Sequence, residues 1–245
     1  MELFEKCFSE LAEMEIFDPR AFSPDENVSK EVCGFILSLA LIYTDIKNLT
    51  MFYQATLESR PKGEFKLQKN WGEYIGLSRF LDRLNISALH ELFKLIEREK
   101  DLLDDSFMKS LIRTLNKEAR SAWKALVDAS LLKVSSDKFS KELMFIRNKI
   151  TFHYDSKIVL SGFEHFIKYG TVTRDPYISR GNNMAKSRFY FADAAAEHYL
   201  LSLVGIDNLE KLFEQVREMI KKINLCIYLI VINFIQKRGV AYRRS

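Results

Sequence analysis

The stretch VSKEVCGFILSLALIYTDIKNLTMFYQATLES, residues 28–59, decides the fold. Its apolar side chains recur at helical spacing, beginning with Val32, Phe35, Ile36 and Leu39, and no proline interrupts them. This pattern predicts one long helix. Because the apolar stripe is wide, we expect several neighbouring helices to cover it.

The same spacing recurs through most of the chain, and only 9 Gly and 4 Pro interrupt the 245 residues. It predicts further helices over residues 2–15, 71–99 with an optional break near 85–87, 105–132, 192–204 and 208–236, and two successive helices over residues 139–168. We therefore expect an all-α protein, a bundle of long antiparallel helices that forms a single domain over residues 1–245.

The cysteines and the apolar runs indicate a cytoplasmic protein. Cys7, Cys33 and Cys226 are scattered and form no CxxC pair, which is typical of a reducing compartment. The N-terminus is acidic and amphipathic, unlike a secretory signal. The longest apolar run, residues 225–235, is too short to span a bilayer and contains Asn233. We expect no membrane association.

The four histidines, His90, His153, His165 and His198, do not suggest a metal centre. None lies three or four positions from another, so no helix presents two of them on one face. HExxH is absent, as are the glycine-rich loops that hold nucleotides. We expect neither a metal ion nor a cofactor.

A second stretch, FIRNKITFHYD at residues 145–155, concentrates side chains suited to phosphate chemistry. Arg147 carries a permanent charge on a planar fork of donors that matches phosphate oxygens. His153 is the residue type that exchanges protons near neutral pH. Asn148 is suited to orient a phosphate or the Arg147 side chain. Tyr154 is suited to stack on a base.

This stretch resembles the motif of the HEPN superfamily, an arginine usually followed by a polar residue and, after four to six residues, a histidine. Five residues separate Arg147 from His153 here. The trailing Tyr154 and Asp155 and the preceding long helices resemble the abortive-infection (AbiU-type) branch. The resemblance covers about a dozen residues. Elsewhere only the all-α pattern supports it.

The resemblance implies a HEPN-like fold and a metal-independent endoribonuclease. It implies Arg147, Asn148 and His153 as catalytic residues. It also implies a homodimer, and a toxin of a toxin–antitoxin or antiviral defence system. RNA is then the substrate, cleaved by attack of its own 2′-hydroxyl on the adjacent phosphate.

Helix geometry separates Arg147 from His153. On a regular helix, His153 lies about 120° around the axis and roughly 9 Å along it from Arg147. One regular helix therefore does not bring both side chains to one phosphate. Either the helix is distorted, or two copies of the motif face each other in a dimer, which agrees with the resemblance. Tyr154 shares the face of Arg147.

A polar segment near residues 169–188 and a basic tail at residues 237–245 provide further cations. Cations beside an aromatic side chain such as Tyr177 are suited to follow an RNA backbone. Such charges are more often simply solvated, so both interpretations stay open. With two motif residues, the candidate RNA-binding set is Lys149, Tyr154, Arg174, Arg180, Lys186 and Arg188.

Structural roles for Arg147 and His153 are the alternative to the nuclease hypothesis. Arg147 is equally able to pair with an acidic neighbour, and His153 to be a partly buried structural histidine. The chain is then a non-catalytic helical module of a toxin–antitoxin or defence system. Such a module binds RNA or a protein partner, for example a nucleotidyltransferase-like antitoxin.

Overall fold

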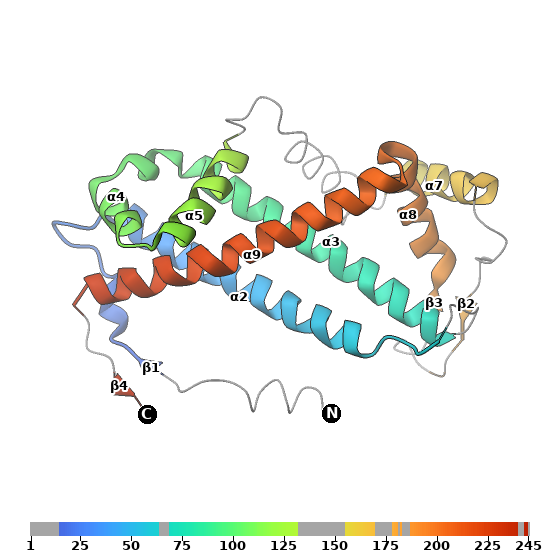
Figure 1. The fold of residues 1–245 in the computed structure, drawn as a ribbon, viewed down its shortest axis with the longest axis horizontal. Helices are drawn as coiled ribbons and strands as arrows, with labels where there is room; N and C mark the ends of the chain where they lie inside the picture. The colour runs from blue at the N-terminus through green and yellow to red at the C-terminus, as the bar shows by residue number, and fades with distance from the viewer. Residues whose placement is uncertain are drawn as a thin grey trace. The chain divides into compact units, whose positions relative to one another are not determined.

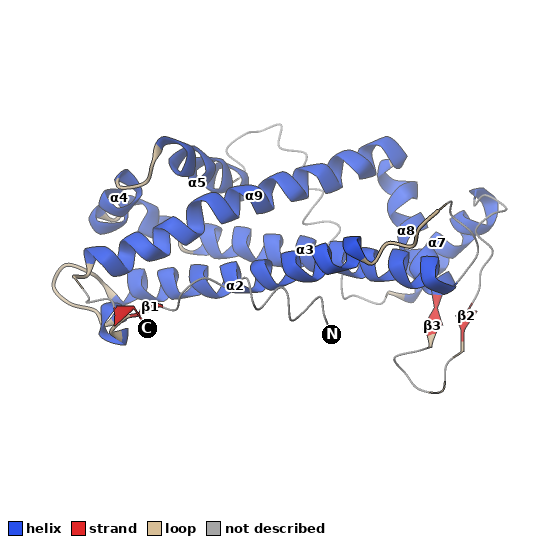
Figure 2. Cartoon of the chain, turned by 60° about the horizontal axis from the view of Figure 1, so that its bottom comes forward, coloured by secondary structure: helices blue, strands red, loops and turns tan. Residues whose placement is uncertain are grey.

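A computed structural model describes residues 15–63, 69–131, 155–169, 178–180, 182, 187–239 and 243–244. Within these ranges the chain is an all-α helical bundle, as the sequence predicts, and helices account for most of what is drawn (Figures 1 and 2). The α-helices are α2 (Lys30–Glu58), α3 (Lys69–Arg98), α4 (Ser106–Arg113), α5 (Lys117–Ser130), α7 (Ser156–Tyr169), α8 (Tyr190–Val204) and α9 (Ile206–Lys237).

The described strands are two residues long and form two antiparallel pairs. Strand β1 (Glu15–Ile16) pairs with β4 (Arg243–Arg244), and β2 (Ile178–Ser179) pairs with β3 (Arg188–Phe189). The sequence offers no periodic signal for pairs this short. Strand β3 ends at Phe189, and α8 begins at the next residue, Tyr190.

The chain divides into two compact units. Unit 1 comprises residues 1–48, 91–140 and 217–245, and unit 2 comprises residues 49–90 and 141–216. Helices α2, α3 and α9 contribute residues to both. The single domain over residues 1–245 stays a prediction.

In unit 1 an aromatic core gathers around Phe234 of α9, which is fully buried. The rings of Phe22 and Phe107 lie with their centroids 5.0 and 5.8 Å from that of Phe234. Phe35 of α2 meets Trp123 of α5 edge-on at 6.5 Å. Burial of apolar area of this kind supplies most of the stabilisation of a helical core. It explains why the apolar stripe of residues 28–59 folds as predicted.

Arg238 joins the end of α9 to the segment before α2. Its guanidinium donates to the carbonyl oxygens of Ala21 (2.9 Å) and Ser23 (2.6 Å) and to the carboxylate of Asp25 (2.5 Å). Hydrogen bonds from the backbone of Asn27 and from Arg238 lower the pKa of Asp25. Arg238, the second residue of the predicted basic tail, therefore has a structural role.

The structure divides one predicted helix and leaves another undivided. The expected helix over residues 105–132 is two helices, because Asn116 caps α5 by accepting a hydrogen bond from the Ala119 backbone N–H at 2.8 Å. The optional break near residues 85–87 does not occur, and α3 is continuous through Asn85 and Ser87. A polar residue inside a helix does not end it when the backbone hydrogen bonds continue.

The length and composition of helix α2 are relevant to the prediction of no membrane association. In the described part of the chain, it is the one helix long and apolar enough to cross a membrane by length and composition. The core helix of a soluble protein passes the same test. The absence of membrane association stays a prediction.

Candidate functional site

The motif at residues 145–155 ends where α7 begins. Asp155 caps this helix: its Oδ1 atom accepts hydrogen bonds from the backbone N–H groups of Lys157 (2.9 Å) and Ile158 (3.4 Å). The Asp155 carbonyl accepts from the N–H of Val159 at 3.0 Å. Aspartate is a favoured N-cap because its carboxylate satisfies backbone donors that have no partner inside the helix.

The cap places the start of α7 (Ser156–Tyr169) within residues 139–168, where the sequence predicts the motif helix and the helix that follows it. The catalytic candidates Arg147, Asn148 and His153 and the RNA-binding candidates Lys149 and Tyr154 lie outside the described residues. Their roles stay predictions.

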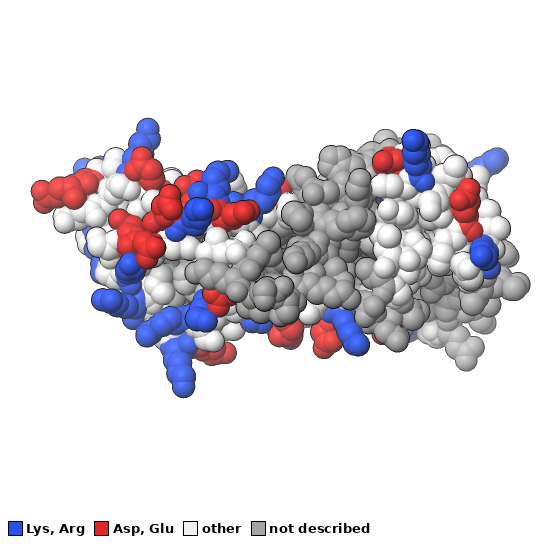
Figure 3. All heavy atoms as spheres, turned by 90° about the horizontal axis from the view of Figure 1, so that it is seen from above, with Lys and Arg blue, Asp and Glu red and all other residues white. Residues whose placement is uncertain are grey.

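Of the other basic candidates, Arg174 and Lys186 also lie outside the described residues. Arg180 is exposed, one residue after β2. On the face shown in Figure 3, lysine and arginine side chains are interspersed with aspartate and glutamate. A mixed surface of this kind attracts a polyanion less than a uniformly basic one.

Arg188 takes part in a polar network with α3 and α8. Its Nε donates to Asp193 at 2.9 Å, and its Nη1 lies 3.5 Å from Glu73. The Tyr190 hydroxyl donates to the same Glu73 carboxylate at 2.7 Å. The guanidinium lies against Gly76, where a Cβ atom would approach it to 2.2 Å. Two carboxylates thus compensate the charge of Arg188, and its contribution to RNA binding stays a prediction.

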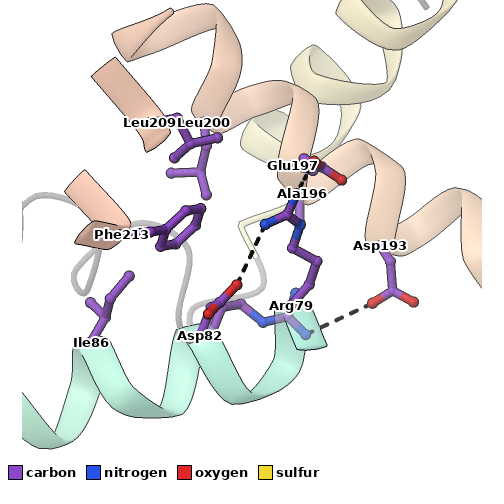
Figure 4. Close-up of a pocket in the computed structure, with 10 residues that line it drawn as sticks. Arg79, Asp82, Ile86, Asp193, Ala196, Glu197, Leu200, Leu209 and Phe213 are labelled. Carbon is purple, nitrogen blue, oxygen red and sulfur yellow. Dashed lines mark hydrogen bonds and ion pairs between the residues drawn. The ribbon is translucent and has the colours of Figure 1, made fainter. Parts of the chain in front are cut away.

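A pocket in unit 2 lies between α3, α8 and the first part of α9 (Figure 4). Asp82 and Glu197 point toward Arg79, which donates to them at 3.4 and 2.6 Å. Arg83 lies 3.9 Å from Asp193. The apolar part of the lining consists of Ile86, Ala196, Leu200, Leu209 and Phe213.

The electrostatics of this pocket favour a closed ion-pair cluster. Burial opposes the charge of Arg79, but attraction by Glu197 and then Asp82 outweighs it and raises the pKa of the guanidinium. The Phe213 ring adds a cation–π contact at 5.5 Å. The lining contains three carboxylates and two guanidiniums, and one of the carboxylates, Asp193, also accepts from Arg188. Because the guanidiniums of Arg79 and Arg83 already face carboxylates, the pocket is poorly suited to a phosphate group.

Two histidines that the sequence places far apart meet between α7 and α8. The Nδ1 atoms of His165 and His198 are 3.1 Å apart, although 33 positions separate the residues. The spacing of the histidines in the sequence reveals only pairs within one helix, so it does not predict this contact. No local signal marks it, because the contact depends on how two helices pack.

Within the described ranges, no group of three or more His, Cys, Asp or Glu side chains is placed to hold a metal ion. The free thiols of Cys33 and Cys226 in this part of the chain are buried.

Comparison of the chain with protein-family models, with curated proteins and with solved structures gives no match.

Proposed function

We propose that the protein is a metal-independent endoribonuclease of HEPN type. The observation that carries this proposal is the motif at residues 145–155, in which Arg147 and Asn148 precede His153 by the spacing typical of that superfamily. The all-α character of the described chain agrees with the proposal. Arg147 and His153 are the residues to which we assign the chemistry.

The reaction is an internal transesterification of RNA. A 2′-hydroxyl oxygen attacks the adjacent phosphorus while His153, as general base, accepts the hydroxyl proton. The bond from phosphorus to the 5′-oxygen breaks, and that oxygen takes up a proton from water. The products are a 2′,3′-cyclic phosphate and a 5′-hydroxyl. Arg147 stabilises the charge that develops on the phosphate oxygens, and Asn148 orients the phosphate or the Arg147 side chain.

The functional unit of the proposal is a homodimer. Because Arg147 and His153 diverge on a regular helix, we place Arg147 of one protomer and His153 of the other at a shared phosphate. Asp155, the last residue of the motif, caps α7 two residues after His153.

In the cell, the proposed activity suits a toxin or a phage-defence effector in the cytoplasm that an antitoxin partner holds inactive. A nucleotidyltransferase-like protein is one candidate for this antitoxin.

The reaction class is tested with a defined RNA cleaved in EDTA. The expected products carry 2′,3′-cyclic phosphate and 5′-hydroxyl ends, and one 2′-deoxy nucleotide at the cleaved position abolishes cleavage there. The matched control carries the 2′-deoxy nucleotide one position away and is still cut. Cleavage of the 2′-deoxy position, 5′-phosphate products or a requirement for metal would each contradict the mechanism. Binding of RNA without cleavage would favour the non-catalytic module.

A further inference from the structure

The imidazole side chains of His165 and His198 meet between α7 and α8. The Nδ1 atoms of His165 and His198 face each other at 3.1 Å, and the ring planes are inclined by 50°. His198 is 6% exposed, and His165 is half-buried. The rings of Phe166 and Tyr169 contact His198 and His165 at centroid distances of 5.0 and 4.7 Å.

The packing of the two helices holds this pair in register. Gly162 of α7 lies so close to α8 that a Cβ atom there would come within 2.0 Å of the Ala195 carbonyl oxygen. His165 follows Gly162 by three positions, and His198 follows Ala195 by three. Both imidazoles therefore lie on the contact faces, one turn from the point of closest approach. Such a backbone contact limits how far the two Nδ1 atoms can separate.

The separation of the two nitrogen atoms matches that of two ligands on one metal ion. Metal–imidazole bonds of about 2.0–2.1 Å place two nitrogens about 3.3 Å apart at a tetrahedral angle. At a right angle, bonds of the same length place them about 2.9 Å apart. The observed 3.1 Å lies between these values. When no metal is bound, a single proton shared between the two nitrogens accounts for the same distance.

We propose that His165 and His198 bind one divalent transition-metal ion, of the zinc, nickel or copper class, through their Nδ1 atoms. Imidazole nitrogen suits these ions, whereas magnesium and calcium prefer oxygen ligands. Water, which reaches the half-exposed His165 side, completes the coordination. The ion fastens α7 to α8 and takes no part in the proposed RNA chemistry, which proceeds in EDTA.

The test uses the full-length chain without an affinity tag. Calorimetry at pH 7.5 is expected to show about one zinc or nickel ion per chain that His165→Ala weakens at least about tenfold. Zinc is also expected to raise the melting temperature, and magnesium to leave it unchanged. His198→Ala, the corresponding substitution in α8, is also expected to weaken binding of the metal ion. Circular dichroism checks that both variants are folded.

Two control variants separate this site from other features. Glu164→Gln changes an exposed neighbour of His165 and is expected to bind zinc like the wild type. His153→Ala is expected to bind zinc normally while it loses RNA cleavage, so the two proposals can fail independently. The metal site is overturned if the wild type binds neither zinc nor nickel, or if His165→Ala binds them as tightly as the wild type does.

Discussion

Arg79 of α3 donates to Glu197 of α8 across 2.6 Å, although 118 positions separate them in the sequence. The side chain of Glu197 is 12% exposed and that of Arg79 is 32% exposed. This pair, with Asp82 beside it, joins two helices of unit 2 at the pocket of Figure 4. Its contribution to stability can be measured against an exposed pair elsewhere in the chain.

We expect Glu197→Gln to lower the free energy of unfolding by about 1–3 kcal/mol, because it leaves a partly buried guanidinium without its strongest partner. Urea denaturation measures the change. The matched control is Glu218→Gln in α9, which removes an exposed ion pair with Lys221 and is expected to lower the free energy of unfolding much less, because solvent screens exposed charges. Equal effects of both substitutions would show that Glu197 contributes no more than a surface charge.

Gly162→Ala is expected to destabilise the protein by about 1–3 kcal/mol, because its methyl group meets the Ala195 carbonyl and the Tyr199 Cβ. Gly34→Ala in α2 is the control: nothing lies within 4 Å of its added Cβ, and alanine favours helix. That change is expected to stabilise the protein by up to about 1 kcal/mol. Thermal melting of both variants distinguishes the two effects. A neutral Gly162→Ala variant would contradict the close packing of α7 on α8.

Cys226 is expected to resist alkylation while the protein is folded. Burial raises the pKa of its thiol to about 12, so only about 10⁻⁴ of it is thiolate at pH 8. Site-resolved mass spectrometry after iodoacetamide treatment measures the labelling, with the same reaction in denaturant as the reference. Labelling of Cys226 at equal rates in the two conditions would mean that α9 opens readily.

An active site shared between two protomers predicts that a mixture of two inactive variants recovers activity. Arg147→Ala and His153→Ala are each expected to be inactive as homodimers, but a mixture that exchanges subunits forms one intact site in every mixed dimer. About a quarter of the wild-type rate is expected after full exchange, because half of the dimers are mixed and one of their two sites is complete.

Cleavage assays before and after exchange at equal total protein measure this recovery. Exchange is verified by native mass spectrometry. A verified mixed dimer without activity would place Arg147 and His153 in the same protomer.

The long helices could be predicted from the sequence because their signal is local and repeated. Helix α2 begins and ends within two residues of the predicted 28–59, and α9 within two residues of the predicted 208–236. The division between α4 and α5 was missed because one side chain, Asn116, decides it. The short strand pairs were missed because they join distant segments without a periodic pattern.

For the candidate sites too, the sequence reveals contiguous motifs but not contacts between distant residues. The motif around Arg147 and His153 is contiguous, so the sequence alone reveals it. The meeting of His165 with His198, and of Arg188 with Glu73, depends on tertiary packing across 33 and 115 positions. Residue types mark such groups as candidates, but only the fold determines which of them meet.

The central claim is tested most directly by the single-turnover rate of RNA cleavage in EDTA for wild type, Arg147→Ala and His153→Ala. The proposed mechanism predicts cleavage by the wild type and a loss of at least about 100-fold in each variant, with helical content unchanged by circular dichroism. Glu164→Gln, which lies outside the motif, should cleave at the wild-type rate. Wild-type rates in both variants, or cleavage that disappears when EDTA is added, would contradict the claim.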